Sequence, residues 1–339
     1  MLPTPSVATF RRKTFPLAAS PRKKLLDNLT RRSRLTNLAV FLIASVCSIS
    51  LLINLRQWAL LPTLGPLPTH TVAFSTANYP STRKKLDHLV VVPCHSIWQG
   101  TSSWLEEKDW LLEPYQKGPG RVRAFYQHIE RSVEIAEQDA NSLLIFSGGQ
   151  TKPFSATTEA ESYLRLAQTS GLIPHETPKS FVHSRSTTEN YAMDSYQNLL
   201  FSVARFREFT GHYPSKITVV GYEFKRARFT ELHRKAVRWP LHKFTYVGVD
   251  PEYEGSTNAL EGERANGYIP YTHDTYGCHS LLLGKRQQRN PFSRFHPYYT
   301  SSPELGSLFD WCPNDFDGGE TTLFSGDLPW DHPTIARES

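Results

Sequence analysis

The sequence predicts an α/β fold, in which helices cover both faces of a Rossmann-like, mostly parallel sheet, with one N-terminal transmembrane helix before it. Three observations lead to this prediction. Short apolar runs recur between residues 88 and 249, and each run ends in a polar loop. Helical stretches separate the runs, as is typical of parallel strands joined by crossover helices. Further upstream, the sixteen residues from Leu38 to Ile53 contain no charge.

The uncharged run predicts a membrane-spanning helix over residues 35–55. At ~1.5 Å per residue, such a helix spans roughly 30 Å, the thickness of a bilayer core. Nine basic residues and one acid precede it in residues 1–34, and only Arg56 follows it closely. The positive-inside rule therefore predicts a signal anchor with a cytosolic N-terminus and a lumenal domain in the secretory pathway. The alternatives are a mitochondrial inner-membrane anchor, since the tail is basic and acid-poor, and a cleaved signal peptide, for which the tail is long.

The formal net charge of +6 does not indicate a nucleic-acid-binding domain. Residues 1–34 contribute +8 from nine bases and one acid, which leaves −2 for the rest of the chain. Because the basic excess belongs to the tail, we expect no nucleic-acid partner. The bilayer is the expected partner of residues 35–55, and the sequence indicates no particular protein partner.

The domain organisation follows from these features. We expect a basic tail over residues 1–34, the transmembrane helix over 35–55 and a Pro- and Thr-rich linker over 56–85. The α/β domain is predicted over 86–299. An irregular C-terminal tail, rich in Pro, Gly, Asp and Ser, is predicted over 300–339.

Within the domain, each element has a local signal. Strands are predicted over residues 88–93, 142–147, 180–183, 216–221 and 243–249, and helices over 121–140, 158–169, 189–209 and 224–238. Two capping boxes are predicted at helix starts, Thr158 with Glu161 and Ser186 with Glu189. Gly211 is predicted to end the long helix.

The cysteines are too few for a disulfide framework. Cys47, Cys94, Cys278 and Cys312 show no zinc-ligand spacing, so no metal site is predicted. One bridge between Cys278 and Cys312 is possible if the domain is lumenal.

Polar loops after the strands form the predicted ligand site, because open α/β sheets bind ligands outside the carboxyl ends of their strands. Pro93-Cys94-His95-Ser96 follows the first strand, and His95 is the polar candidate there. Ser147-Gly148-Gly149 follows the second strand, where paired glycines allow backbone N–H groups to converge on an anion. Glu159 opens the next helix, where a carboxylate either favours the helix dipole or faces the cleft.

Two further loops carry more polar groups than helix capping requires. In Ser184 to Asn190, capping needs only one hydroxyl and one carboxylate, so the surplus makes this loop the best ligand-contact candidate. Lys225, Arg226 and Arg228 lie at a helix start, where the dipole disfavours cations and an anionic ligand would compensate them. The alternative is that some of these bases lie on a solvated face. The predicted ligand-binding residues are Arg121, Ser147, Gly148, Gly149, Glu159, Arg185, Thr187, Glu189, Asn190, Lys225 and Arg228, and the acid–base candidates are Glu159, Glu189 and His95.

The ordered set of these loops resembles the domain-of-unknown-function 218 family, of the ElyC/SanA/YdcF type. The corresponding segments are Arg121-Val122, Ser147-Gly148-Gly149, Thr158-Glu159-Ala160, Thr187 to Ala192, and Val219 to Arg228. The chain is also similar to a fungal membrane-anchored branch, through Tyr276-Gly277-Cys278 and the segment from Lys285 to Pro291. The chain departs from the family pattern at Lys225, where the family has His, and at Pro93 to Ser96, which replace a Gly-rich strand end.

The resemblance implies a Rossmann-like fold with a polar site at the strand ends. Some members of the family are linked to cell-envelope and lipid-carrier processes, and one type to S-adenosylmethionine, which is thus a cofactor by analogy only. From the residues themselves, we expect the domain to bind a small anionic, phosphate-bearing ligand; whether it also acts on that ligand stays open. A non-catalytic, membrane-tethered scaffold is the alternative, because no complete catalytic signature is present.

Overall fold

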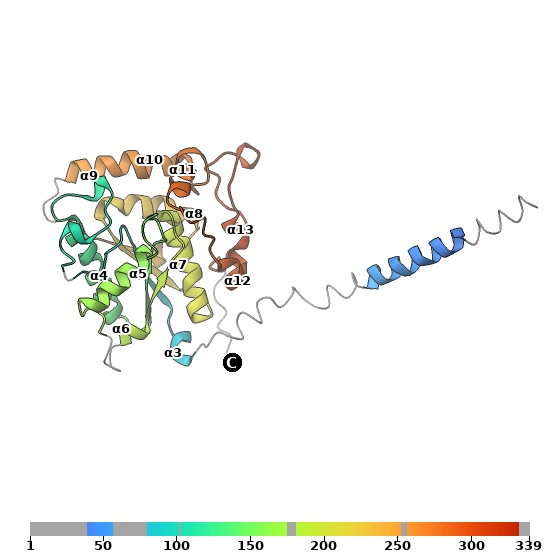
Figure 1. Cartoon of the computed structure of the whole chain (residues 1–339), viewed down its shortest axis with the longest axis horizontal. Coiled ribbons are helices and arrows are strands. Elements are labelled where there is room, and N and C mark those ends of the chain that lie inside the picture. The colour runs from blue at the N-terminus through green and yellow to red at the C-terminus, as the bar shows by residue number, and fades with distance from the viewer. Residues whose placement is uncertain (1–38, 57–79, 102, 175–180, 252–255, 332–339) are drawn as a thin grey trace, which may run out of the picture. The chain divides into compact units, whose positions relative to one another are not determined.

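The computed structural model describes residues 39–56, 80–101, 103–174, 181–251 and 256–331 (Figure 1). The whole tail 1–34 and most of the linker 56–85 lie outside these ranges. Ala39–Arg56 forms one helix with a mean hydropathy of 2.0, which is long and apolar enough to cross a membrane. The remaining ranges belong to a separate compact unit, the α/β domain.

The sheet of this domain has five parallel strands in the order β3-β2-β1-β4-β5. The strands are β1 (His88–Pro93), β2 (Ser142–Ser147), β3 (Ser186–Glu189), β4 (Lys216–Gly221) and β5 (Phe244–Gly248). The predicted α/β class is thus confirmed, and the bounds of β1, β2 and β4 are those predicted from their apolar runs. Residues of β1 and β2 are buried throughout, as expected of central strands that are covered on both faces.

Helices cover both faces of the sheet (Figure 1). On one face, α4 (Arg121–Gln138) and α5 (Glu159–Thr169) pack against Val90, Val92 and Phe146. On the other face, α7 (Ser195–Thr210) packs against Leu89, Val91 and Ile145. Alternate residues of each central strand therefore enter two separate apolar cores, in accordance with the two-residue repeat of a strand.

The capping prediction for α5 is confirmed, and that for α7 is wrong. The Thr158 hydroxyl accepts a hydrogen bond from the backbone N–H of Glu161, and the Glu161 carboxylate accepts from that of Thr158. By contrast, Ser186 and Glu189 belong to β3, and α7 begins six residues later, with Asp194 as its N-cap. Gly211 ends α7 with φ of 89°, as predicted.

The predicted strand 180–183 is also wrong. Phe181–Ser184 forms the short helix α6, and residue 180 lies outside the described residues. The true strand is the polar segment Ser186–Glu189, which occupies the edge of the sheet next to β2. Three of its four residues are only partly buried, so this strand does not show the apolar run that marked the other strands.

The region predicted as one helix over 224–238 contains three kinds of helical turn. It consists of the 3₁₀ turn η3 (Glu223–Lys225), the π-helix η4 (Arg228–His233) and α8 (Arg234–Ala236). After β5, α9 (Ser256–Glu263), the π-helix η6 (Arg264–Tyr268) and α10 (Ile269–His273) form one continuous helical rod. Figure 1 shows this rod along one end of the domain, next to α11 (Ser280–Gln288).

The C-terminal segment consists of short helices that complete the core on the α7 side. These include α12 (Tyr298–Ser301) and α13 (Gly306–Phe309), and Leu305, Leu308, Phe324 and Leu328 are buried in the same apolar cluster as α7. The other short elements are α3 (Ser81–Lys84), η1 (Glu107–Asp109), η2 (Pro114–Gln116), η5 (Leu241–Lys243), η7 (Pro303–Leu305) and η8 (Asp315–Asp317).

Candidate functional site

The strand order places a switch point between β1 and β4. The chain proceeds from β1 outward to β2 and β3, and then returns to the other side of β1 to add β4 and β5. The loops after β1 and β4 therefore diverge, and a crevice opens between them at the carboxyl ends of the strands. Cys94 and His95 follow β1, and Tyr222 to Arg228 follow β4.

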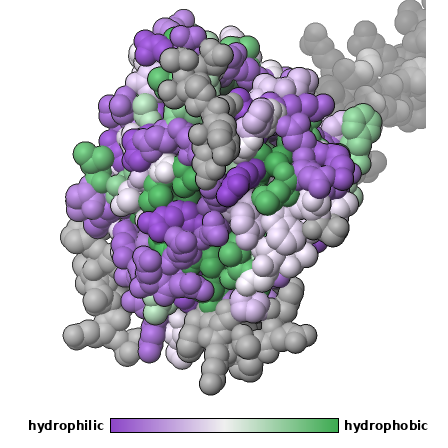
Figure 2. All heavy atoms as spheres, turned by 90° about the vertical axis from the view of Figure 1, so that its left-hand side faces the viewer, coloured by the Kyte–Doolittle hydropathy of each residue, from purple (hydrophilic) through white to green (hydrophobic). Residues whose placement is uncertain are grey.

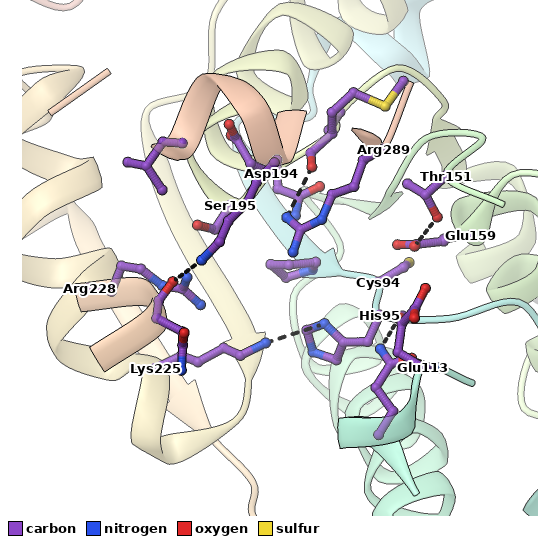
Figure 3. A pocket seen from close by; sticks show the side chains of 18 of the residues that line it. Cys94, His95, Glu113, Thr151, Glu159, Asp194, Ser195, Lys225, Arg228 and Arg289 are labelled. Atoms are coloured by element: carbon purple, nitrogen blue, oxygen red, sulfur yellow. Dashed lines mark hydrogen bonds between the residues drawn. The ribbon is translucent and has the colours of Figure 1, made fainter. Parts of the chain in front are cut away.

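A cavity of about 170 Å³ occupies this crevice. Five cationic side chains line it, from Lys152, Lys225, Arg228, Lys285 and Arg289. It adjoins a wider cleft of about 980 Å³, and Lys225, Arg228 and Arg289 line both. Figure 3 shows Lys225 and Arg228 on one side of the space, with His95, Cys94 and Glu159 on the other.

The wider cleft has an apolar side as well as a charged one. Leu111, Leu112, Phe125, Phe154 and Phe224 contribute to its lining. Figure 2 views the side of the domain on which α9 lies in Figure 1, and apolar side chains there gather between hydrophilic ones. A ligand that fills both spaces would place its charge in the small cavity and its less polar part in the wider cleft.

Lys225 and His95 face each other across the switch point. The Lys225 ammonium lies 3.5 Å from His95 Nδ1 and 5.1 Å from the centre of the Tyr222 ring. Burial, and then the charge of Arg228, lowers the pKa of Lys225 to about 7. Burial, and then the charge of Lys225, lowers the pKa of His95 well below its usual range, so this imidazole is neutral. Lys225 thus has a neutral neighbour where a buried ammonium ordinarily has a carboxylate.

Arg228 is held at the cavity by an ion pair with the rod that contains α9. Its Nε lies 3.0 Å from a carboxylate oxygen of Glu263, and both side chains are largely buried. Gly267, one turn further along the rod, permits this approach, because a Cβ there would lie 2.7 Å from Arg228 Nη1. Lys152 is likewise paired, with Glu113.

Glu159 contributes a buried carboxyl group to the cavity wall. As the first residue of α5 it is fixed by the Thr158 cap, and its Oε1 accepts a 2.6 Å hydrogen bond from the Thr151 hydroxyl. Burial raises its pKa. Gly148 makes room for it, because a Cβ at that position would lie 2.9 Å from Glu159. Of the predicted site residues, His95, Glu159, Lys225 and Arg228 line the small cavity, and Arg121 lines the wider cleft.

The other predicted acid–base candidate, Glu189, does not line either space. It is fully buried, and its carboxylate accepts hydrogen bonds from Ser147 Oγ at 2.7 Å, Tyr298 Oη at 3.1 Å, and the backbone N–H groups of Tyr191 at 2.8 Å and Ala192 at 3.2 Å. These four donors hold the start of the segment that leads into α7. The structure therefore gives Glu189 and Ser147 a packing role.

The backbone N–H groups of Gly148 and Gly149, which we expected to bind an anion, are used within the protein. The N–H of Gly148 donates to the carbonyl of Glu189 at 3.0 Å, and that of Gly149 donates to the carbonyl of Ala192 at 2.8 Å. Neither N–H is left for an anion. The pair is required instead by close packing, since a Cβ on Gly149 would lie 2.8 Å from the Ala192 carbonyl.

Three more predicted residues lie away from the cavity. Arg185 precedes β3 at the opposite, amino edge of the sheet, where it donates to the carbonyls of Ser142 at 2.7 Å and Ala136 at 2.9 Å. Thr187 accepts a hydrogen bond from Arg205, and Asn190 accepts one from Thr158. These polar groups are bound by the protein itself.

Several cavity residues were not predicted. Lys285 and Arg289 lie four residues apart, on and just after α11, and Ser195 begins α7. Asn266 comes from the rod, and Tyr115 and Gln116 come from the long loop before α4. Two signals in the sequence pointed to Lys285 and Arg289: their four-residue spacing, which places both on one helix face, and the resemblance of the segment from Lys285 to Pro291 to a fungal branch.

One cluster has the composition of a metal site. The ligand atoms of Cys278, His279 and Cys312 lie within 4.8 Å of one another. However, the two cysteines form a disulfide with a Cα–Cα distance of 5.9 Å, and His279 Nε2 lies 2.7 Å from the Pro313 carbonyl. A disulfide offers no thiolate, so in this oxidised form the cluster is a covalent tie between the start of α11 and the C-terminal segment.

Among curated proteins, an uncharacterized yeast protein is similar to this chain, whereas the comparison with family models found nothing. The chain is 28% identical over 296 residues to the uncharacterized protein YOR238W of Saccharomyces cerevisiae. The alignment covers 72% of this chain and 97% of the yeast protein. No family model matches the chain. No solved structure matches it either. The name of the yeast protein states no activity.

Proposed function

We propose that the α/β domain binds a small anionic, phosphate-bearing ligand in the cavity at the carboxyl ends of β1 and β4. The strongest support is the lack of ion-pair partners for three of the cationic side chains in the cavity. Lys225, Lys285 and Arg289 form no ion pair within 4.0 Å among the residues that the structure describes. Three carboxyl groups also line the cavity, but Glu113 is paired with Lys152 and Asp194 with Arg286, which leaves Glu159. The unpaired cations therefore outnumber the unpaired carboxyl groups. This excess of positive charge is costly in a partly buried space, and a bound anion reduces that cost.

The size of the two spaces fits such a ligand. A cavity of roughly 150 Å³ holds a molecule of about six heavy atoms, and a phosphate group has five. The 170 Å³ cavity would therefore hold the phosphate. The 980 Å³ cleft, with its apolar side, would take the organic part of the ligand.

The membership of the domain-of-unknown-function 218 family is part of this proposal. Two of the motif segments that suggest it, Thr158-Glu159-Ala160 and Val219 to Arg228, supply Glu159, Lys225 and Arg228 to the cavity. The Lys at 225 keeps a cation at the position where the family has His, which suits anion binding.

A binding experiment on the detergent-solubilised full-length chain tests the proposal. Calorimetric titration with inorganic phosphate and with phosphate monoesters should show saturable binding that weakens with salt. Arg228→Ala should weaken it at least tenfold, whereas Arg131→Ala, which removes an exposed base on α4, should leave it unchanged. If phosphate does not bind, or binds Arg228→Ala equally well, the proposal fails; recovery of the chain in a stable protein complex would then favour the scaffold.

We further propose that the N-terminus is cytosolic and the domain lumenal. The basic tail before Ala39–Arg56 supports this orientation. The disulfide between Cys278 and Cys312 supports an oxidising compartment for the domain. In sealed microsomes, added protease should remove the tail and leave the domain intact. Digestion of the domain would contradict the orientation, and co-fractionation with mitochondria would favour the inner-membrane alternative.

A further inference from the structure

A serine and a histidine are paired at the wall of the cavity. Ser195, the first residue of α7, lines the cavity, and its Oγ lies 2.7 Å from His233 Nε2. His233 is completely buried behind it. A hydroxyl that faces a ligand space and hydrogen-bonds to an imidazole behind it is the arrangement of an activated nucleophile.

The π-helix η4 brings this histidine and the anion-binding Arg228 to the same site. Arg228 and His233 are its first and last residues, five positions apart. In an α-helix, residues five apart point about 140° away from each other. In a π-helix, the hydrogen bond joins residues i and i+5, so that they lie one turn above each other, and such turns frequently occur at functional sites.

The imidazole is held in place by aromatic rings. The Tyr271 and Phe229 rings pack edge-on against His233, with centroid distances of 4.5 Å and 5.3 Å. Nδ1 of His233 is buried and makes no hydrogen bond in the part of the chain that the structure describes. In the tautomer that carries its proton on Nδ1, Nε2 accepts the hydrogen bond from Ser195 Oγ and is ready to take its proton.

The charges around the pair suit an anionic substrate. Burial, and then the charges of Arg228 and Arg286, lowers the pKa of His233 well below its usual range, so the imidazole is neutral and weakly basic while the cavity is empty. A bound phosphate would offset the charge of Arg228. Asp194, the residue next to Ser195, is itself neutralised by Arg286 at 2.6 Å, so its carboxylate does not repel the phosphate.

From this geometry we propose that Ser195 is a nucleophile, with His233 as its base, for transfer of the phosphoryl group of a phosphate monoester. The inference rests on the proposed function, because the cavity must first bind the phosphate. Ser195 Oγ attacks phosphorus while its proton passes to His233 Nε2. The new Oγ–P bond forms as the bond to the alcohol oxygen breaks, and the leaving alcohol takes the proton from the imidazolium. In the second step, His233 takes a proton from water, whose oxygen attacks phosphorus. The Oγ–P bond breaks, Ser195 Oγ takes the proton from the imidazolium, and inorganic phosphate is released.

The test uses the full-length chain in detergent with 4-nitrophenyl phosphate as the probe. After an acid quench, mass spectrometry should find one phosphoryl group on Ser195, together with release of nitrophenolate. Ser195→Ala should abolish both. His233→Gln, which keeps a polar side chain of similar reach, should slow nitrophenolate release by about 10²–10⁴-fold, the usual contribution of a general base. Ser170→Ala, at the end of α5, is the matched control and should behave as the unmodified chain.

A measurement of inorganic phosphate binding distinguishes failure of the Ser195–His233 dyad from failure of the phosphate-binding cavity. Ser195→Ala should still bind phosphate in calorimetry, with affinity within about threefold of the unmodified chain, and His233→Gln should do the same. If the unmodified chain binds phosphate but no phosphoserine forms, or the label appears on another residue, the dyad is overturned and the binding function stands. If the chain does not bind phosphate, both proposals fall together.

Discussion

A cluster of charged side chains lies at each end of the strands, one at the amino edge of the sheet and one at the carboxyl edge. The two clusters differ in how fully their charged groups are paired. At the amino edge, Asp139 accepts hydrogen bonds from His88 and Lys216, both at 2.8 Å, and Arg185 donates to the surrounding carbonyls. At the carboxyl edge, the Lys225 ammonium has a neutral imidazole beside it, and His95 Nε2 is buried without a described partner. The amino edge is the more nearly satisfied of the two, although Arg185 Nε has no partner among the described residues, whereas the Lys225 ammonium at the carboxyl edge has no carboxylate beside it.

We therefore expect the amino-edge cluster to contribute mainly to stability and the carboxyl-edge cluster mainly to ligand binding. A complete network contributes to the folded state and has little left to offer a ligand, whereas an incomplete one costs stability until a ligand completes it. The pKa values show the same contrast. Although burial opposes it, hydrogen bonds from Lys216, the Asn141 N–H and His88 lower the pKa of Asp139 to about 2. By contrast, burial and then the charge of Arg228 lower the pKa of Lys225 to about 7.

The largest expected effect is at the amino edge. Arg185→Ala removes the Arg185 donors from the buried carbonyl oxygens of Ser142 and Ala136, and leaves Ala136 with a long hydrogen bond of 3.4 Å from Ser142 Oγ. We expect the free energy of unfolding to fall by about 3–5 kcal/mol, measured by urea denaturation of the full-length chain. Phosphate affinity of the folded fraction should not change. A loss of affinity without a loss of stability would instead place Arg185 among the ligand contacts, as the sequence suggested.

Lys225→Met should lower phosphate affinity without lowering stability, the opposite of what we expect for Arg185→Ala. Replacing a buried cation that lacks a carboxylate with an apolar side chain of similar length should leave stability unchanged or raise it. Phosphate affinity should fall by about 10–100-fold, or about 1.4–2.8 kcal/mol. Lys216→Met, a matched change at the amino edge, should lower stability slightly and leave affinity intact. Equal behaviour of the two variants would remove the distinction between the edges.

The pH dependence of stability gives a third, smaller effect. The pKa of Lys225 is lowered in the folded chain, so between about pH 7 and its unfolded value the unfolded chain binds more protons. Stability therefore gains from Lys225 as pH rises above 7, by less than about 1.4 kcal/mol per pH unit. Comparing denaturation curves at pH 7 and 8.5 for the unmodified chain and Lys225→Met should show this gain only in the former. A parallel change in both would show that Lys225 is not the group responsible.

The smallest effect concerns the helix start that positions Glu159. Thr158→Ala removes the N-cap of α5 and the hydrogen bond to Asn190. We expect a loss of about 1 kcal/mol in stability and less than a threefold change in phosphate affinity. Thr158→Ser, which keeps the hydroxyl, should retain most of the stability. A larger loss of affinity would mean that the orientation of Glu159 is more important than the cavity cations.

The sequence predicted the parts of the fold with a local cause. The buried strands β1, β2 and β4 have continuous apolar runs, and the start of α5 and the end of α7 have explicit caps. The strand β3 was misplaced because its residues, Ser186 to Glu189, are polar and resemble a capping box. The start of α7 was misplaced for the same reason: Glu189 accepts backbone N–H groups as a cap would, but does so from within a strand.

The predicted part of the site comes from the segments that follow β1, β2 and β4, including Glu159 at the start of α5. His95, Lys225 and Arg228 come from loops whose position follows from the switch-point rule. Lys285 and Arg289 reach the cavity from α11, about 190 residues after His95, by a tertiary arrangement that no local pattern specifies. The excess polarity of the loop before Asn190 was a misleading signal, because those side chains bind other parts of the protein.

The most direct test of the incomplete carboxyl edge is a proton count during phosphate binding. Bound phosphate should raise the pKa of Lys225 above its value of about 7, so that binding at pH 8 takes up nearly one proton per chain. Calorimetric titration of the full-length chain with inorganic phosphate, repeated in buffers of different ionisation enthalpy, measures this number after correction for titration of the phosphate itself. We expect net uptake in the unmodified chain and none in Lys225→Met. Binding without proton uptake, or equal uptake in the variant, would contradict it.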